Sequence, residues 1–198
     1  MLKAILFDMD GTLTQPLIDW REVRRQLAVP EGASIMDQVE SLDGDQREEA
    51  EQLLKRIEYE AATQAHPNPG VVELVERLHE SGLRTGLVTN NHERAMMCVV
   101  RKLGLQFDLL LSREDGVAKP APDLVLLALR RLNVNAADAV FVGDGRYDRA
   151  ASAAAKVSYI HLDPDRAAPQ VGPTIHALTE LWPFIVPLLD SSRRDPCK

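Results

Sequence analysis

Short apolar runs that alternate with helical patterns are the feature that most constrains what this chain can fold into. Five runs are rich in aliphatic and β-branched residues and are too short for buried helices, so each predicts a buried strand. The runs are Ala4–Phe7, Thr85–Thr89, Phe107–Leu111, Ala139–Gly143 and Val157–Leu162. Strands that alternate with helices form mainly parallel sheets, so the fold class is α/β. We expect a Rossmann-like parallel sheet of about five strands with helices on both faces.

The segments between these runs have the apolar spacing of amphipathic helices. The residues that would share a buried helical face are Val71, Leu74, Val75 and Leu78, then Met96, Val99, Val100 and Leu103, and then Leu124, Leu127 and Ala128. Gly82 and Gly104 stand where the first two helices would end. Pro122 stands where the first turn of the third helix tolerates proline.

Residues 16–66 interrupt the alternation, because they carry no strand pattern. Trp20, Val23 and Leu27 form a short amphipathic stripe, and we expect Trp20 to lie in the core of a helical hairpin. Asp45 and Glu48 resemble a capping box that opens a longer helix. The apolar face of that helix would comprise Leu53, Leu54, Ile57 and Ala61.

These boundaries predict how the chain is organised. Pro67–Gly70 reads as a stiff connection back to the sheet. We therefore expect an α/β core of residues 1–15 and 67–190, and a small α-helical insertion of residues 16–66. The polar segment 191–198 is expected to be a flexible tail.

Composition and charge exclude several classes of protein. The chain has 198 residues, of which 45% are hydrophobic and 27% charged, and this suits one globular core domain. A net charge of −7 offers no basic surface to a nucleic acid polymer. Two cysteines are too few for a disulfide framework, and no CxxC pair indicates zinc. The sequence lacks an apolar stretch of about 18 residues, so no membrane span is expected.

The first apolar run also bears on location. Ala4–Phe7 is shorter than the run of about seven apolar residues that a secretory signal needs. Asp8 and Asp10 end it at once. We therefore expect a cytoplasmic protein. As a separate expectation, the protein would be a monomer or weak dimer.

Polar side chains follow four of the predicted strands or the loops after them. In an open parallel sheet, ligands bind beyond the carboxyl ends of the strands. The residues delivered to that edge are Asp8 and Asp10, Thr89 and Asn90, Lys119, and Asp144 and Asp148. Any one of them alone could be a solvated turn, a helix cap or a surface charge. Their joint arrival at one edge favours a functional site.

The chemistry of this set points to phosphate. Four carboxylates together would raise one another's pKa unless a cation compensates them. Mg²⁺ suits the place, because it takes a few carboxylate or carbonyl oxygens and accepts a phosphate oxygen. Lys119 adds a positive charge and Thr89 a hydroxyl donor. Side chains two residues apart, as in Asp8-x-Asp10, can point the same way, so one carboxylate could attack phosphorus while the other moves protons.

At these residues the chain resembles the haloacid dehalogenase (HAD)-like hydrolase superfamily, and within it the phosphoglycolate phosphatase/β-phosphoglucomutase-like subgroup. The signature DxDGT matches Asp8–Thr12, and the Ser/Thr motif matches Leu87–Asn90. The lysine motif matches Ala118–Asp123, and the acidic motif GDxxxD matches Gly143–Asp148. The four motifs stand in the family order and together cover residues 1 to about 165. Gly145 departs from the Ser that many relatives carry at this position.

The resemblance implies a role for each residue. Asp8 would be the nucleophile and Asp10 the general acid/base of a Mg²⁺-dependent phosphatase that forms an aspartyl-phosphate intermediate. Thr89, Lys119 and the backbone N–H of Asn90 would bind the phosphoryl oxygens. The metal ligands would be the Asp8 side chain, the Asp10 backbone carbonyl and Asp144. Asp148 would order a metal-bound water or Lys119.

The resemblance also implies a place for the insertion and a class of substrate. Residues 16–66 occupy the position of the helical cap that closes over the site in this subgroup, although they are fewer than in the usual cap. The substrate would be a small phosphorylated metabolite, and sugar phosphates, phosphoglycolate and nucleotides all stay open. Further candidates for substrate contact are Arg21, Arg24 and Arg25 on the insertion, and His92 and Arg146 beside the motifs.

Three other activities compete with a phosphatase. Dehalogenases lack the second aspartate, which Asp10 supplies here, and a phosphonatase needs a motif-borne cap lysine, whereas Lys55 has no motif around it. A phosphosugar mutase keeps the same core motifs and stays an alternative. A non-catalytic phosphate-binding protein of the same fold would be marked by loss of Asp8, Asp10 or Lys119, and all three are present.

Overall fold

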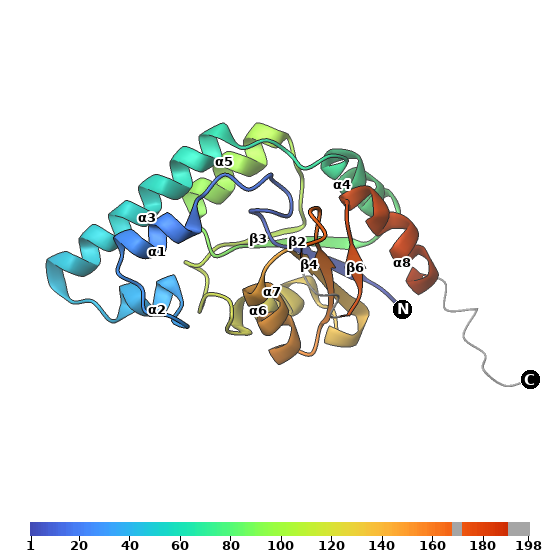
Figure 1. Cartoon of the computed structure of the whole chain (residues 1–198). Coiled ribbons are helices and arrows are strands. Elements are labelled where there is room, and N and C mark those ends of the chain that lie inside the picture. The colour runs from blue at the N-terminus through green and yellow to red at the C-terminus, as the bar shows by residue number, and fades with distance from the viewer. Residues whose placement is uncertain (168–171, 190–198) are drawn as a thin grey trace, which may run out of the picture.

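In the part of the chain that the structure describes, six parallel strands form one sheet in the order β3-β2-β1-β4-β5-β6 (Figure 1). The computed structural model describes residues 1–167 and 172–189, so the expected tail 191–198 lies outside the described residues. The strands are β1 (Ala4–Phe7), β2 (Arg84–Val88), β3 (Leu109–Leu111), β4 (Ala139–Gly143), β5 (Ser158–Leu162) and β6 (Thr174–Ile175). The predicted α/β fold is confirmed, with β1 at the centre between β2 and β4.

Helices cover both faces of the sheet. On one face lie α4 (Val71–Glu80), α5 (Glu93–Leu103) and α8 (Leu181–Leu189), and on the other α6 (Asp123–Leu132) and α7 (Arg146–Ala154). The four residues of β1 are fully buried and alternate between the two layers, so Ile5 and Phe7 pack under the first set while Ala4 and Leu6 pack under the second. The described residues also form short 3₁₀ helices at η1 (Ala136–Asp138), directly before β4, and at η2 (Leu178–Glu180), directly before α8.

The strand predictions need correction at β6 and β3, whereas β2 is shifted by one residue from its predicted run and β5 begins one residue later than predicted. β6 was not predicted, because a two-residue strand that pairs with the end of β5 has no pattern of its own. β3 begins at Leu109 rather than at Phe107. The preceding Asp108 carboxylate accepts a hydrogen bond from the Thr85 backbone N–H at 2.8 Å. This N–H of β2 is therefore already bonded to a side chain, and the pairing of β2 with β3 begins one residue later, at Gly86 and Leu109.

The insertion (residues 16–66) contains three helices rather than a two-helix hairpin. They are α1 (Trp20–Gln26), α2 (Ile35–Glu40) and α3 (Gly44–Gln64). The missed helix, α2, has a capping box in which Ser34 and Asp37 bond each other's backbone N–H groups. The predicted capping box at Asp45 and Glu48 is wrong, because α3 begins at Gly44 with Asp43 as its N-cap, which places Asp45 inside the first turn.

The buried face of the insertion also differs from the prediction. Along α3, the fully buried residues are Ala50, Leu54, Glu58 and Ala62. Leu53 and Ile57 are only partly buried against them. Trp20 is 37% exposed and lines a cavity, so its predicted place in the hairpin core is wrong. No helix among the described residues has both the length and the apolarity that crossing a membrane requires.

Candidate active site

The carboxyl edge of the sheet brings the predicted residues together. Asp8 follows β1 directly, and its backbone N–H continues the ladder by donating to Val142 O at 3.0 Å. Thr89 follows β2, and its N–H donates to Leu111 O in the same way. Asp144 follows β4, while Asp148 lies in the first turn of α7. Parallel strands therefore deliver these groups to one edge, as the sequence predicts.

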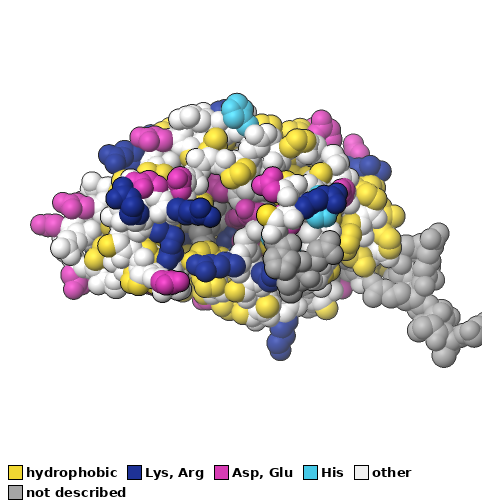
Figure 2. Space-filling model, in the orientation of Figure 1, with side chains coloured by type: hydrophobic (Ala, Val, Ile, Leu, Met, Phe, Trp, Pro, Cys, Tyr) yellow, Lys and Arg dark blue, Asp and Glu magenta, His cyan; other side chains and the backbone are white. Residues whose placement is uncertain are grey.

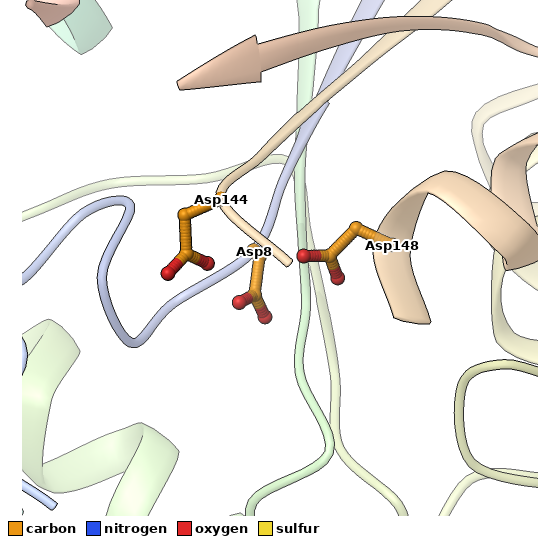
Figure 3. A group of neighbouring side chains, drawn as sticks. All are labelled: Asp8, Asp144 and Asp148. Carbon is orange, nitrogen blue, oxygen red and sulfur yellow. The ribbon is translucent and has the colours of Figure 1, made fainter. Parts of the chain in front are cut away.

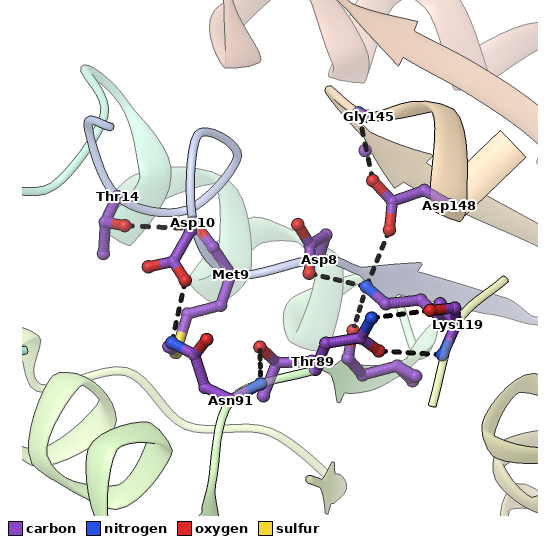
Figure 4. Close-up of polar contacts among 12 residues, drawn as sticks. Asp8, Met9, Asp10, Thr14, Thr89, Asn91, Lys119, Gly145 and Asp148 are labelled. Atoms are coloured by element: carbon purple, nitrogen blue, oxygen red, sulfur yellow. Dashed lines mark hydrogen bonds and ion pairs between the residues drawn. The ribbon is translucent and has the colours of Figure 1, made fainter. Parts of the chain in front are cut away.

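Lys119 is the buried centre of this site (Figure 4). Its Nζ donates to Asp8 Oδ1 at 2.6 Å, to Asp148 Oδ1 at 2.6 Å and to the Val88 carbonyl at 2.8 Å. Burial lowers the pKa of Lys119, but the charges of Asp148 and Asp8 raise it by more, so the net shift is upward. The ammonium group therefore stays charged and holds both carboxylates in place.

Asp8, Asp144 and Asp148 form a carboxylate cluster whose side chains converge from three segments (Figure 3). One carboxylate oxygen from each lies within 4.8 Å of the others. Burial and the Asp148 charge raise the pKa of Asp8 well above its usual range, although Lys119 opposes them. Partial enclosure and Asp148 also raise the pKa of Asp144, to about 6. Three hard oxygen ligands with excess negative charge could hold a divalent cation.

Two glycines make room for this cluster. A Cβ at Gly11, where φ is +75°, would overlap the Asp144 carboxylate. A Cβ at Gly143 would come within 2.7 Å of the Asp148 carboxyl carbon. Asp148 Oδ2 also accepts a hydrogen bond from the Gly145 N–H at 3.1 Å, which orients its carboxylate toward Lys119. The Gly145 departure thus removes neither a carboxylate nor the lysine from the site.

Asp10 lies apart from Lys119 and has a different partner. Its Oδ2 accepts a hydrogen bond from Asn91 Nδ2 at 2.7 Å (Figure 4). Burial raises the pKa of Asp10 to about 6, although the Asn91 hydrogen bond acts in the opposite direction. The sequence interpretation did not include Asn91, and its position directly after the Thr89-Asn90 pair was the available signal. The structure thus gives the two carboxylates of the DxD motif separate surroundings.

The side chains of Thr89 and Asn90 make hydrogen bonds to the backbone of the loop after β2 and of the loop that carries Lys119. Thr89 is buried, and its Oγ1 accepts a hydrogen bond from the Asn91 N–H at 3.1 Å. The Asn90 side chain grips the backbone of Lys119 on both sides: Nδ2 donates to Lys119 O at 2.7 Å, and Oδ1 accepts from Lys119 N–H at 2.8 Å. The side chain of Asn90 therefore positions the lysine, a role that the sequence did not predict.

A cavity of about 330 Å³ lies between the sheet edge and the insertion. The insertion contributes Trp20, Arg24, Ser34, Ile35, Met36, Leu54 and Glu58 to its wall. The core contributes every predicted site residue together with Asn91 and the loop of Gly145, Arg146 and Tyr147. In Figure 2, Lys and Arg side chains gather around a hollow between the insertion and the core. An anionic molecule would meet positive charge at this entrance.

The candidates for substrate contact fall into two groups. Arg24 and Arg146 line the cavity. The Arg24 guanidinium also bonds the Ala33 and Pro30 carbonyls, at 2.9 and 2.8 Å, which fixes its position. Arg25 instead pairs with Glu22 on the surface, and Arg21 is exposed. His92 is buried against Glu58 rather than placed at the entrance.

The fold and the site define the class of protein: an α/β enzyme whose reactive groups lie at the carboxyl edge of a parallel sheet. The chain belongs to the haloacid dehalogenase-like hydrolase family, whose model matches residues 2–156. This confirms the resemblance that the four sequence motifs indicate.

Named relatives cover most of the chain. Phosphoglycolate phosphatase of Xanthomonas campestris is 31% identical over 209 residues, which cover 91% of this chain and 95% of that protein. N-acetylmuramic acid 6-phosphate phosphatase of Pseudomonas aeruginosa is 29% identical over 196 residues, which cover 84% and 87%. A solved hydrolase structure from Pseudomonas syringae shares the fold with a TM-score of 0.76, at 20% identity, over 92% of this chain and 97% of that one. The prediction of an enzyme of this family, with phosphatases as its relatives, is confirmed.

Proposed function

We propose that the protein is a Mg²⁺-dependent phosphatase that hydrolyses a small phosphomonoester through an aspartyl-phosphate on Asp8. The observation that carries the proposal is the geometry of Lys119, whose Nζ lies 2.6 Å from both Asp8 and Asp148 at the floor of the cavity. A buried ammonium beside a carboxylate nucleophile is suited to a phosphoryl group, because both the attack and the equatorial oxygens need charge compensation.

In the first step, the Asp8 carboxylate attacks phosphorus and the bond to the leaving oxygen breaks. Asp10 gives its proton to that oxygen, so the alcohol leaves neutral. A pKa of about 6 suits Asp10 to this task, because part of the population is protonated near neutral pH. Thr89 and Lys119 bind the equatorial oxygens as charge develops on them. Asn90 keeps Lys119 in place through its two backbone hydrogen bonds.

In the second step, the ionised Asp10 takes a proton from water, which attacks the aspartyl-phosphate. Phosphate leaves, Asp8 is regenerated as a carboxylate, and Asp10 is protonated again for the next cycle. The insertion limits how much bulk water reaches the intermediate, since Trp20, Met36 and Leu54 line the wall that faces the sheet edge.

The carboxylate cluster fits Mg²⁺. Its ligands are hard oxygens, and burial and mutual repulsion raise the pKa of both Asp8 and Asp144, which a cation would relieve. We assign the ligands to the Asp8 side chain, the Asp10 backbone carbonyl and Asp144. Asp148, which already holds Lys119 and the Gly145 N–H, stays outside this set. When bound, the ion supplies positive charge to the nucleophile and to a phosphoryl oxygen.

The substrate is a small metabolite with one phosphate and a compact leaving group. The cavity of about 330 Å³ suits a ligand of this size. The relatives are named for phosphoglycolate and for N-acetylmuramic acid 6-phosphate, which are both small phosphomonoesters. Arg24 and Arg146 line the cavity together with the reactive groups and favour a polar or anionic leaving group.

Asp8→Asn tests the nucleophile. With Mg²⁺ and p-nitrophenyl phosphate, we expect kcat to fall on the order of 10⁴-fold or more, because the amide cannot attack phosphorus. After acid quench, mass spectrometry should find a phosphoryl group on the peptide that contains Asp8 in the wild type only. Asp45→Asn, the same change at an exposed position of α3, should keep full activity. Undiminished turnover by Asp8→Asn contradicts the assignment.

A panel of phosphorylated metabolites separates a phosphatase from a mutase. An isomerised phosphosugar formed without release of free phosphate would indicate a mutase instead.

A further inference from the structure

A carboxylate of the insertion, Glu58, lies in the wall of the catalytic cavity although it belongs to none of the four motifs. It comes from α3, and its side chain is only 3% exposed. Its neighbours on the buried face of that helix are Ala50, Leu54 and Ala62, which are apolar. A charged group in such a position requires strong partners, because burying an unpaired carboxylate is highly unfavourable.

The partners of Glu58 are groups of the core. His92, directly before α5, donates its backbone N–H and its Nδ1 to Glu58 Oε2, at 2.9 and 2.7 Å. Arg113, in the loop after β3, donates Nη1 to both carboxylate oxygens, at 2.6 and 2.7 Å. The Arg113 side chain is 8% exposed, so solvent screens this pair little. Glu58 therefore joins the loops that follow β2 and β3.

Both loops continue to the reactive groups. The same Nη1 of Arg113 donates to the Asn90 carbonyl at 2.9 Å, and the Asn90 side chain grips the backbone of Lys119. Beside His92, the Asn91 amide holds Asp10 at 2.7 Å, and the Asn91 carbonyl accepts from the Arg113 backbone N–H at 3.2 Å. Two short chains of hydrogen bonds thus run from Glu58, one to Lys119 and one to Asp10.

We propose that Glu58 is a positioning residue of the active site, which holds from the insertion the two loops that place Lys119 and Asp10. The inference rests on the proposed phosphatase function and adds a residue to it. Glu58 does not attack, protonate or bind the phosphoryl group. It sets the position of the groups that do.

The packing of α3 makes this anchor rigid. In Figure 1, α3 lies along α5 of the core. Beyond Glu58, the Arg94 guanidinium lies over the Tyr59 ring with its Cζ 4.1 Å from the centroid, and Lys102 Nζ donates to Thr63 O at 2.6 Å. Three links from the last two turns of α3, at Glu58, Tyr59 and Thr63, fix the helix against α5 and the residue that precedes it. A displacement of Glu58 would therefore be transmitted to the loops rather than absorbed by the helix.

Glu58→Gln in the full chain tests the proposal, because the amide keeps the size but cannot accept all four hydrogen bonds that the three donor groups make. With Mg²⁺ and p-nitrophenyl phosphate, we expect kcat to fall about 10- to 100-fold, as a misplaced lysine and acid would cause. Inorganic phosphate, as inhibitor and as calorimetric ligand, should bind more weakly. Amide hydrogen exchange should become faster in residues 89–92 and 113–119. Glu49→Gln, at an exposed position of the same helix, should change none of these.

A second variant guards against a folding defect. Arg113→Lys keeps the charge, but its side chain is one bond shorter, so its ammonium group cannot take the place of Nη1 between Glu58 and Asn90, and it should show the same pattern. The losses in the double variant should be smaller than the product of the single losses, because both act through one chain. Unchanged kcat and phosphate affinity in folded Glu58→Gln or Arg113→Lys would overturn the proposal, whatever happens to the melting temperature. An inactive wild type would refute the phosphatase function, while phosphate binding and hydrogen exchange would still test Glu58.

Discussion

At Gly11 the backbone turns with a φ of +75° directly under the Asp144 carboxylate. Gly11→Ala would place a methyl group where that carboxylate lies, so Asp144 must move away from Asp8. We expect a weaker apparent affinity for Mg²⁺ and a fall in kcat of about 10- to 100-fold, because the metal and nucleophile lose their alignment. Titration of activity with Mg²⁺ separates the two effects.

Gly82 provides the matched control for Gly11. Its φ is +77°, but a Cβ there would meet no atom within 4 Å. Gly82→Ala should therefore lose stability by about 1–2 kcal/mol from backbone strain alone and keep its activity. Equal losses of activity in both alanine variants would show that strain, and not contact with Asp144, is responsible.

At the scale of the element, the first five strands and the motif loops were predictable because each has a local signal. β1 and β4 match their apolar runs residue for residue, and Gly104 ends α5 in a left-handed conformation as expected. The carboxyl-edge rule then places Asp8, Lys119 and Asp144 without any contact being known. A parallel sheet converts sequence order into spatial neighbourhood, so these residues needed no tertiary information.

The parts that were missed depend on tertiary partners. β6 exists because the end of β5 offers it backbone groups, and its own two residues carry no period. The positioning role of the Asn90 side chain arises only once the loop of Lys119 folds against it. Glu58 looked like an ordinary helix charge, since its burial follows from Arg113 and His92, which are distant in sequence. The core could be predicted from local sequence patterns, whereas the contacts between the insertion and the core could not.

The short helix α2 depends on its capping box, which makes it testable. Ser34 is buried, accepts from Asp37 N–H at 2.9 Å and lines the cavity beside Ile35 and Met36. Ser34→Ala should lower the free energy of unfolding by about 1 kcal/mol, because one end of a six-residue helix loses its cap. It should also raise KM for the metabolite substrate more than it lowers kcat, since Ile35 and Met36 of α2 line the cavity and none of the reactive groups lies on this helix.

The comparison for Ser34 lies at the other end of α2. Ser41 Oγ donates to the Gln38 carbonyl at 2.7 Å on the surface, away from the cavity lining. Ser41→Ala should change both the stability measured by urea unfolding and the KM less than Ser34→Ala does. If the two alanine variants share one KM, α2 does not shape the site through its cap.

At the scale of the whole molecule, positively charged side chains line the cavity although the net charge of the chain is negative. The chain carries −7, yet Arg24 and Arg146 line the cavity and Lys119 lies at its floor. The carboxylate cluster brings negative charge to that floor, where a cation can neutralise it. The sheet supplies the reactive groups, and the insertion supplies the opposite wall together with the anchor at Glu58. Site chemistry and global stability are therefore coupled through the same few carboxylates.

For the metal-free protein, this coupling predicts a free energy of unfolding that falls as the pH rises. The pKa values of Asp10 and Asp144 are raised from 3.8 to about 6, so the folded protein holds protons that the unfolded chain has released in this range. When the folded state binds more protons, the free energy of unfolding falls as pH rises. These two groups should therefore lower the free energy of unfolding as pH rises from about 4 to 6.

Mg²⁺ should reverse the trend above pH 6 and, at a hundred times its Kd, add about 2.7 kcal/mol to the free energy of unfolding. Urea unfolding across this range, with Mg²⁺ or with a chelator, measures both effects. Asp144→Asn should show a shallower slope and a smaller gain from Mg²⁺, and equal slopes in the two proteins would contradict the raised pKa of Asp144.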